Sequence, residues 1–499
     1  MRFLHYKKDI LAFLAGSLLL LAFAPFELPL IAFVSIISLL WLLLDISPLK
    51  AARTGYFFGL GYFGFGVYWV YYSIHHFGHA PLWLSIIIML GMVAILASYI
   101  ALISYLLNRF FTQYKAVRYL IAFPALWLAG EYFRSMLFTG FPWLSLGFSQ
   151  IDTLLAAWAP VVGVYGVSWL TVLVAACVFL GFQSSSWLGR TSAFIVFLSC
   201  WLGAWQLNDV EWSQPRGKAI SVALLQGNIP QEIKWSRDFR QPTLDAYRQM
   251  NADSAEVDLV VWPETAIPAF YHEVEKDYLA GIQKEAIASD TDVVLGIPVL
   301  GHQAGQYYNG LLSIRQMGQF YRKHHLVPLG EYMPLKPFST FILAFLNIPL
   351  SDFSAGDAQQ PLLTAAGYPF ASSICYEDVF QQTSLVGLPE AAYLVNVSND
   401  TWFGDTIAPF QHLEMARMRA LESGRYMLRS TNTGITAIID HKGRINKQAP
   451  MFKRHSLTGE IIPMQGATPF VQGAGQIMPA FLTVLLLLCI SFRDKPAKD

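Results

Sequence analysis

The sequence predicts a helical membrane protein with one large α/β sandwich domain inserted before its last membrane span. The chain has 499 residues, of which 54% are hydrophobic and 14% charged, whereas soluble globular chains carry about 25% charged residues. Apolar runs follow one another from residue 9 to about 207. The composition from about 210 to 465 is that of an ordinary soluble domain, and one more apolar run comes after it.

The apolar runs have the length of membrane-crossing helices, which need about 20 residues. We therefore expect eight transmembrane helices. Their expected bounds are 9–24, 28–45, 55–78, 82–108, 117–137, 155–183, 191–207 and a last span that contains Leu482–Ile490. The chain then divides into seven membrane helices over 1–210, a soluble domain over 211–466, and the eighth helix with its tail over 467–499.

Basic residues lie in alternate loops between these runs. They are Lys7 and Lys8; Lys50 and Arg53; Arg109, Lys115 and Arg118; Arg190; and Arg493, Lys495 and Lys498. Loops rich in lysine and arginine stay in the cytoplasm, so we expect both termini there and the soluble domain on the periplasmic side. Ala22-Phe23-Ala24 looks like a signal-peptide cleavage site, but Pro25 is unfavourable for cleavage, and we interpret the first run as a span.

The inserted domain alternates strand and helix patterns. The expected strands are Ala219–Leu225, Asp258–Trp262, Asp292–Ile297, Tyr307–Ile314, Gly318–Tyr321, Phe370–Ile374, Ala392–Val397, Met427–Ser430 and Thr436–Asp440. The expected helices are Leu244–Asp253, Glu273–Ser289 and Pro409–Ser423. Such alternation, followed by antiparallel signals, predicts an α/β sandwich.

Cys375 is the only cysteine in the inserted domain, because Cys177, Cys200 and Cys489 lie within apolar runs. Cysteines outside the cytoplasm tend to be oxidised in pairs. A cysteine without a partner there is a candidate reactive thiol. The alternative is a small buried core residue, which is the commoner fate of a lone cysteine.

Three polar residues follow apolar strands: Glu264, Lys323 and Cys375. Strand ends often carry catalytic groups, because the scaffold is rigid and the loop is open. A thiol needs a base to become a nucleophile. A carboxylate can supply that base, and an ammonium can stabilise an oxyanion. Together they favour acyl transfer through a thioester, although the glutamate can also serve as a helix start and the lysine as one of several solvated bases.

The sequence around these residues resembles the Glu-Lys-Cys motifs of the nitrilase (carbon-nitrogen hydrolase) superfamily. The matching stretches are Val261–Thr265, Tyr321–Pro328 and Ile374–Glu377. With its membrane frame, the whole chain resembles the apolipoprotein N-acyltransferase family of bacterial inner-membrane enzymes. Further matching stretches are Gly227–Gln231 with Trp235, Pro328–Pro334, Asn396–Gly404 and Phe141–Trp143.

The resemblance implies a nitrilase-like αββα sandwich and a two-step reaction. A fatty acyl chain passes from the sn-1 position of a phospholipid, with phosphatidylethanolamine the expected donor, to a cysteine. It then passes to the α-amine of a diacylglyceryl-cysteine apolipoprotein. The resemblance implies neither a metal nor a cofactor, and we expect a monomer.

The resemblance also assigns roles to individual residues. It makes Cys375 the nucleophile, Glu264 the general base and Lys323 the oxyanion partner. The residues that it implies as supporting ones are Glu331, Glu377, Tyr376 and Trp235.

Both substrates are held in the bilayer, so an apolar entrance to the site is expected. The stretch Leu329–Leu350 carries Met333, Phe338 and Phe341 and fits a mobile arm that enters the membrane interface; an ordinary packed loop is the alternative. Trp402 is a further candidate for substrate binding. Trp143 is either the floor of the substrate cavity or an interfacial anchor.

Two polar residues in the membrane half also allow two interpretations. Glu131 and Arg134 are three residues apart near the outer end of an expected span. Ions inside a membrane are functional candidates by default, and this spacing also allows a simple pair.

Composition and the membrane frame weigh against other functions. A net charge of zero, from 34 basic and 34 acidic residues, argues against binding nucleic acid. The cysteines show no spacing typical of zinc. A membrane-tethered amidase is the nearest alternative, since it shares the chemistry, but it needs no eight-span frame. A transporter predicts many intramembrane ions and an internal repeat, and the sequence shows few such ions and no repeat.

Overall fold

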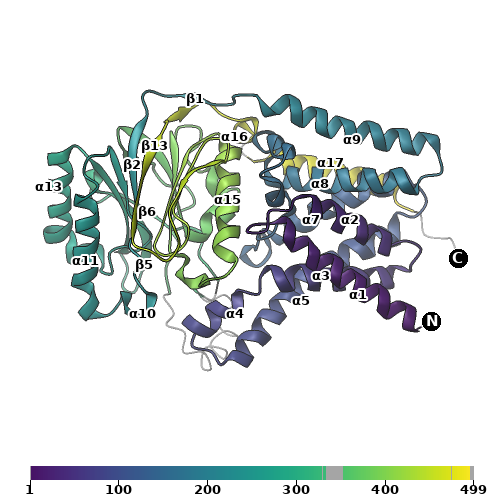
Figure 1. Ribbon diagram of the computed structural model, residues 1–499, viewed down its shortest axis with the longest axis horizontal. Coiled ribbons are helices and arrows are strands. Elements are labelled where there is room, and N and C mark those ends of the chain that lie inside the picture. The colour runs from purple at the N-terminus through teal and green to yellow at the C-terminus, as the bar shows by residue number, and fades with distance from the viewer. Residues whose placement is uncertain (1, 329, 333–351, 474, 495–499) are drawn as a thin grey trace. The chain divides into compact units, whose positions relative to one another are not determined.

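The computed structural model describes residues 2–328, 330–332, 352–473 and 475–494, and it divides into two compact units (Figure 1). The first is helical and comprises Met1–His75, Pro81–Val210 and Gly473–Asp499. The second comprises His76–Ala80 and Glu211–Gln472. Each unit is described by itself below.

The helical unit has helices at the positions of the expected spans. The longer ones are α1 (Arg2–Leu19), α2 (Leu30–Leu42), α3 (Pro48–Gly66), α5 (Leu82–Phe110), α7 (Phe123–Arg134), α8 (Ala159–Gln183), α9 (Trp187–Asn208) and α17 (Ile477–Phe492). Three described stretches are long and apolar enough to cross a membrane: Leu82–Phe110, Leu154–Gln183 and Trp187–Asn208. The helices α2 and α17 are apolar but shorter. This supports a helical membrane unit and does not confirm eight spans.

Glu131 and Arg134 both hold the loop that follows α7. The Nη1 atom of Arg134 donates to the carbonyl oxygens of Phe141 and Trp143. The carboxylate of Glu131 accepts from the backbone N–H of Leu146 at 2.8 Å. Both side chains are buried, so these hydrogen bonds pair Arg134 Nη1 and Glu131 Oε1, which would be costly to leave unpaired.

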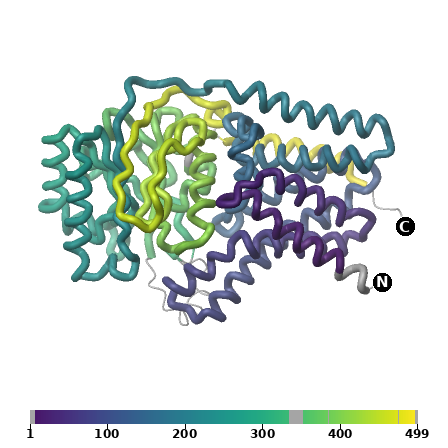
Figure 2. Tube along the Cα trace, in the orientation of Figure 1, coloured from purple at the N-terminus to yellow at the C-terminus, as the bar shows by residue number. Residues whose placement is uncertain are grey.

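The second unit contains two six-stranded sheets, each with a parallel centre. The first has the order β13-β2-β3-β4-β5-β6 and the second β12-β11-β10-β9-β8-β7. The first sheet is formed by β2 (Ile220–Gln226), β3 (Leu259–Val261), β4 (Asp292–Leu300), β5 (Tyr307–Ser313), β6 (Phe320–Arg322) and β13 (His455–Ile461). The second is formed by β7 (Leu363–Ala365), β8 (Tyr368–Ile374), β9 (Tyr393–Ser398), β10 (Met427–Thr431), β11 (Ala437–Ile439) and β12 (Ile445–Gln448). Figure 2 shows β13, near the end of the unit, beside β2 at its start.

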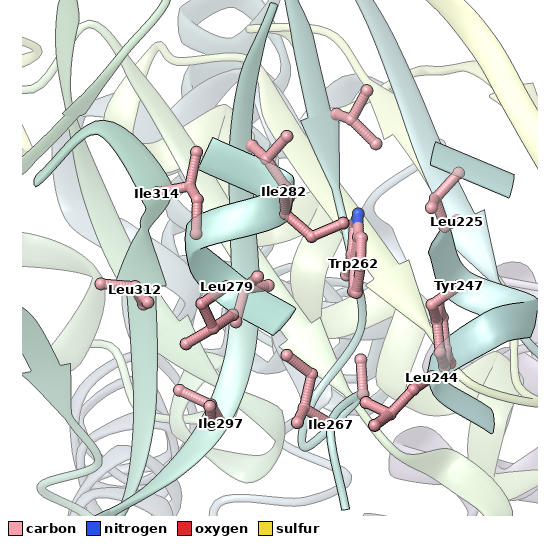
Figure 3. Close-up of a cluster of buried hydrophobic side chains, with 14 of the residues drawn as sticks. Leu225, Leu244, Tyr247, Trp262, Ile267, Leu279, Ile282, Ile297, Leu312 and Ile314 are labelled. Atoms are coloured by element: carbon pink, nitrogen blue, oxygen red, sulfur yellow. The ribbon is translucent and has the colours of Figure 1, made fainter. Parts of the chain in front are cut away.

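Helices cover the outer face of each sheet. The first sheet packs against α11 (Arg237–Ala252) and α13 (Ala280–Ser289), and the second against α15 (Ala408–Ser423) (Figure 1). In the first core, the rings of Tyr247 and Trp262 stack with centroids 5.3 Å apart (Figure 3). The inner faces of the sheets meet, where the hydroxyl of Ser430 donates to Leu225 O at 3.0 Å. The unit is therefore an αββα sandwich.

The direction of the strands decides where the candidate residues lie. In the first sheet β4 is parallel to β3, and β5 is antiparallel to both β4 and β6. It follows that β3 and β6 run the same way, so their carboxyl ends lie at the same edge of the sheet. Glu264 follows β3 and Lys323 follows β6 at that edge. Cys375 follows β8 of the facing sheet.

Candidate active site

Glu264 lies on a tight turn after β3. The next residue, Thr265, has a φ of 43°, a left-handed conformation that is uncommon for a β-branched residue. Gly296 on β4 makes room for this turn, because a Cβ atom there would lie 2.6 Å from both Pro263 O and Thr265 N. The side-chain amide of Asn309 donates to Glu264 Oε1 at 2.7 Å. The other carboxylate oxygen, Oε2, is buried without a hydrogen-bond partner among the described residues.

Lys323 is fully buried at the end of β6. Its backbone N–H donates to Asn309 O at 2.8 Å, and its Nζ donates to Glu331 Oε1 at 2.8 Å. Burial lowers the pKa of Lys323, but the facing carboxylates, Glu331 more than Glu264, raise it by a larger amount, so the net pKa lies above the usual lysine value. The ammonium therefore stays charged across the physiological pH range.

Cys375 is the first residue after β8 and begins a short 3-10 turn, Cys375–Val379. Its φ of 54° is a strained conformation of the kind that occurs at active sites. The side chain is buried. Burial raises the pKa of the Cys375 thiol, Glu264 raises it further, and Lys323 opposes them. The thiol is therefore protonated at rest and needs a base to become a nucleophile.

Glu264 has the ionisation expected of such a base. Burial raises the pKa of its carboxyl, Lys323 lowers it, and Glu331 raises it again, so the net pKa lies above the usual glutamate value. A raised carboxyl pKa is closer to neutral pH, which suits a group that both takes and returns a proton. Glu264, Lys323 and Cys375 thus share one electrostatic environment.

Glu377 connects the lysine loop with the cysteine turn. Its carboxylate accepts hydrogen bonds from the backbone N–H groups of His324 at 2.8 Å, His325 at 3.0 Å and Ile374 at 2.8 Å. It also accepts from the Tyr321 hydroxyl at 2.9 Å. The side chain is fully buried. Glu377 therefore fixes the segments on either side of Lys323 and Cys375 relative to each other.

The other expected supporting residues, Tyr376, Trp235 and Glu331, differ in burial and in contacts. Tyr376 is buried, with its ring 5.0 Å from that of Phe380. Trp235 is 51% exposed, which leaves a large aromatic surface open beside α10 (Gln231–Lys234). Glu331 accepts a hydrogen bond from Lys323 Nζ at 2.8 Å.

The candidate substrate-binding residues are only partly described. Trp402 is half-buried, and its ring lies 5.0 Å from that of Phe77. Trp143 is wholly buried in the helical unit, 4.8 Å from the ring of Trp69, so its ring has no surface for an interfacial anchor. Met333, Phe338 and Phe341, with most of the expected arm, lie outside the described residues.

A buried ionic network beside the cysteine turn was missed by the sequence interpretation. Arg429 on β10 donates to Asp378 Oδ2 at 2.8 Å, Asp400 Oδ2 at 3.1 Å and Asn396 Oδ1 at 2.6 Å. Asn396 donates in turn to Cys375 O at 3.4 Å. The available signal was a charged residue in the middle of an apolar strand, at Met427–Thr431.

His412 completes this network from α15. Its Nε2 lies 2.7 Å from Asp378 Oδ1, and its Nδ1 lies 2.8 Å from Arg429 Nη2. All four charged or titratable members are at most 1% exposed. Within the described part of the chain, no group of three or more His, Cys, Asp or Glu side chains is arranged to hold a metal ion.

Two family models match the chain. The "Apolipoprotein N-acyltransferase N-terminal domain" matches residues 15–177 and "Carbon-nitrogen hydrolase" matches residues 221–466. The chain is 47% identical to an apolipoprotein N-acyltransferase of Methylococcus capsulatus, over 93% of this chain and 92% of that protein. It is 42% identical to the one of Nitrosomonas europaea, over 97% of each, and 40% identical to the one of Coxiella burnetii, over 96% and 99%.

The fold and the family matches place the chain in the class of proteins in which a helical membrane unit carries a carbon-nitrogen hydrolase domain. Full-length relatives at 40–47% identity narrow the class. The chain belongs to the apolipoprotein N-acyltransferase family and is an acyltransferase.

Proposed function

We propose that the chain transfers a fatty acyl group from a membrane phospholipid, through a thioester on Cys375, to the N-terminal α-amine of a diacylglyceryl-cysteine apolipoprotein. The observation that carries this proposal is the buried oxygen Oε2 of Glu264, which has no hydrogen-bond partner among the described residues. The protonated thiol of Cys375 and the charged ammonium of Lys323 lie in the same electrostatic environment. These are the three groups that acyl transfer to and from a thiol requires.

In the first step, Glu264 Oε2 takes the proton of the Cys375 thiol as the sulfur attacks the sn-1 ester carbonyl of the phospholipid. The Lys323 ammonium stabilises the negative charge that develops on the carbonyl oxygen. The C–O bond then breaks, and Glu264 returns the proton to the leaving alkoxide. A lysophospholipid departs, and the acyl group stays on sulfur as a thioester.

In the second step, the neutral α-amine of the apolipoprotein cysteine attacks the thioester carbonyl. Glu264 takes one proton from the nitrogen as the C–N bond forms, and Lys323 again faces the oxyanion. The C–S bond breaks, and the proton passes from Glu264 to the departing thiolate of Cys375. The enzyme returns to its starting state, which makes the reaction a ping-pong cycle with no metal or cofactor.

The location that we propose follows from the substrates. A phospholipid and a lipid-anchored protein both lie in a bilayer, and helices such as α5 and α9 have the length and hydropathy to cross one. We place the protein in the bacterial inner membrane as a monomer with eight spans, both termini in the cytoplasm and the catalytic domain in the periplasm. The distribution of lysine and arginine among the loops supports this orientation. Phosphatidylethanolamine is the proposed donor.

Hydrolysis is the second candidate, because the carbon-nitrogen hydrolase domain can use water in place of an amine. The two functions differ in their product. The purified full chain is mixed with phosphatidylethanolamine and a synthetic diacylated lipopeptide, and the lipids are analysed by mass spectrometry. The proposal predicts an N-acylated lipopeptide and an equal amount of lysophospholipid. Free fatty acid with an unchanged lipopeptide would instead establish a hydrolase.

A further inference from the structure

A second buried lysine lies beside the glutamate turn. Lys234, at the end of α10, is 2% exposed. Its Nζ donates to the hydroxyl of Thr265 at 2.8 Å and to the backbone carbonyl of Glu264 at 3.2 Å. Both of these partners are neutral oxygens. Burying an ammonium without a carboxylate at contact distance costs folding free energy, so another interaction must offset the burial of Lys234.

The charges around Lys234 point to Glu264. Burial lowers the pKa of Lys234 to about 8, and the charged group that opposes this is Glu264. Conversely, Lys234 is one of the groups that lower the pKa of Glu264, after Lys323 and the hydrogen bond from Asn309. Lys323 is already bound to Glu331 at 2.8 Å, whereas Lys234 contacts the turn that carries Glu264.

We propose that Lys234 is a positioning residue for the reaction: it holds the Glu264–Thr265 turn and supplies a positive charge that keeps the Glu264 carboxylate ionised. This rests on the proposed function, in which Glu264 must be ionised to take a proton. The charged groups that face Glu264 are Lys234 from α10, Lys323 after β6, and Glu331 from the turn that follows it. Cys375 faces the same carboxylate from the other sheet.

The proposal predicts a pH-dependent defect. Lys234→Met removes the charge and keeps an unbranched side chain of similar length. Without that charge the pKa of Glu264 rises, so the acidic limb of the rate profile moves to higher pH. In the wild type Lys234 itself loses its proton near its pKa of about 8, so the two proteins should become alike in alkali. We expect acyl-enzyme formation by Lys234→Met to be slower on the acidic limb, by about tenfold for each unit by which the pKa of Glu264 rises. The two rates should be nearly equal above about pH 9, where Lys234 of the wild type has lost its proton.

Two further variants separate the charge from the hydrogen bonds. Thr265→Val removes the hydroxyl that Lys234 binds, while it keeps the β-branched shape at the left-handed position and the charge of Lys234. Its acidic limb should stay where it is in the wild type. Lys234→Arg keeps the charge and should also leave the limb in place. If Lys234→Met does not fold, Lys234→Gln gives the same test, because its amide can still donate to Thr265.

The measurement is the rate of acyl-enzyme formation on the purified full chain with phosphatidylethanolamine in mixed detergent micelles, followed by intact-protein mass across the pH range. A limb shifted in Lys234→Met and unshifted in Thr265→Val supports the proposal. A folded Lys234→Met or Lys234→Gln protein with the wild-type limb overturns it. If the proposed function itself is wrong, the result differs from both of these, because the wild type would then form no acyl-enzyme at any pH.

Discussion

Asn309 donates a hydrogen bond from its side-chain amide to Oε1 of Glu264 at 2.7 Å, while its backbone carbonyl accepts from the N–H of Lys323 at 2.8 Å. One residue of β5 thus orients the proposed base and fixes the backbone of the proposed oxyanion partner. The other oxygen, Oε2 of Glu264, has no hydrogen-bond partner among the described residues, and it is the oxygen that we propose takes the thiol proton.

Asn309→Leu removes the amide while keeping the size of the side chain. The hydrogen bond favours the charged form of Glu264, so its loss raises the pKa of the carboxyl and frees its rotation. Hydrogen bonds to charged groups contribute about 1.5–3 kcal/mol, and we expect acyl-enzyme formation at neutral pH to fall at least about tenfold. Single-turnover kinetics of the acylation step would measure this. An unchanged rate would contradict the role of Asn309.

The wild-type rate should fall on the acidic side at a pH above the usual glutamate value. Burial raises the pKa of Glu264, and only its ionised form can accept the thiol proton. Protonation therefore removes the base as the pH falls through this raised pKa. Lys323 does not limit the rate on that side, because its pKa is raised and it stays charged. A profile of acylation rate against pH that stays flat below the ordinary glutamate pKa would be inconsistent with this assignment.

Gly296→Ala should displace the turn that carries Glu264. The added Cβ would lie 2.6 Å from Pro263 O and Thr265 N, both of them backbone atoms that cannot move independently of the turn. Misplacing a catalytic group by about 1 Å can cost about a hundredfold in rate, and we expect a loss of that order in acyl-enzyme formation.

Gly281→Ala is the matched control for this change. Its Cβ would meet only the end of the Arg248 side chain at 3.8 Å, and alanine favours the helix over glycine by about 1 kcal/mol. This variant should keep full activity and unfold at the same or a slightly higher temperature. Equal activity in both variants would show that the turn tolerates the methyl group.

Arg429→Met should destabilise the second unit strongly. It leaves the buried carboxylates of Asp378 and Asp400 without the cation that contacts them at 2.8 and 3.1 Å. Removing one partner of a buried ion pair costs about 3–5 kcal/mol. Arg248→Met provides the control, because its ion pair with Glu285 is exposed and contributes about 0–1 kcal/mol. Denaturant unfolding would measure both; similar losses in the two variants would contradict the importance of the buried network.

Much of the sandwich could be predicted because its strands are short apolar runs that end at polar residues. Glu264, Lys323 and Cys375 stood out for that reason, and the structure places all three at the ends of β3, β6 and β8. Their catalytic roles stay predictions. The strand β13 was missed because its partner, β2, lies at the other end of the domain's sequence. In addition, His455–Ile461 has no strong apolar alternation of its own.

The buried network could not be predicted in the same way. Asp378, Asp400, His412 and Arg429 come from four separate elements, and a sequence alone does not show which charged side chains face one another. Lys234 was missed for a related reason, since lysine side chains usually face solvent. Only the fold shows that it faces the turn after β3.

The mass of the intact protein after incubation with phosphatidylethanolamine tests the central claim most directly. We predict that the wild type gains one fatty acyl group, that proteolysis maps it to Cys375, and that a diacylated lipopeptide removes it. Cys375→Ala and Cys375→Ser should insert and fold but gain no acyl group. Cys177→Ala and Cys489→Ala should behave as the wild type. Retained N-acylation of the lipopeptide by Cys375→Ala, or a wild type that never carries an acyl group, would contradict a thioester on Cys375.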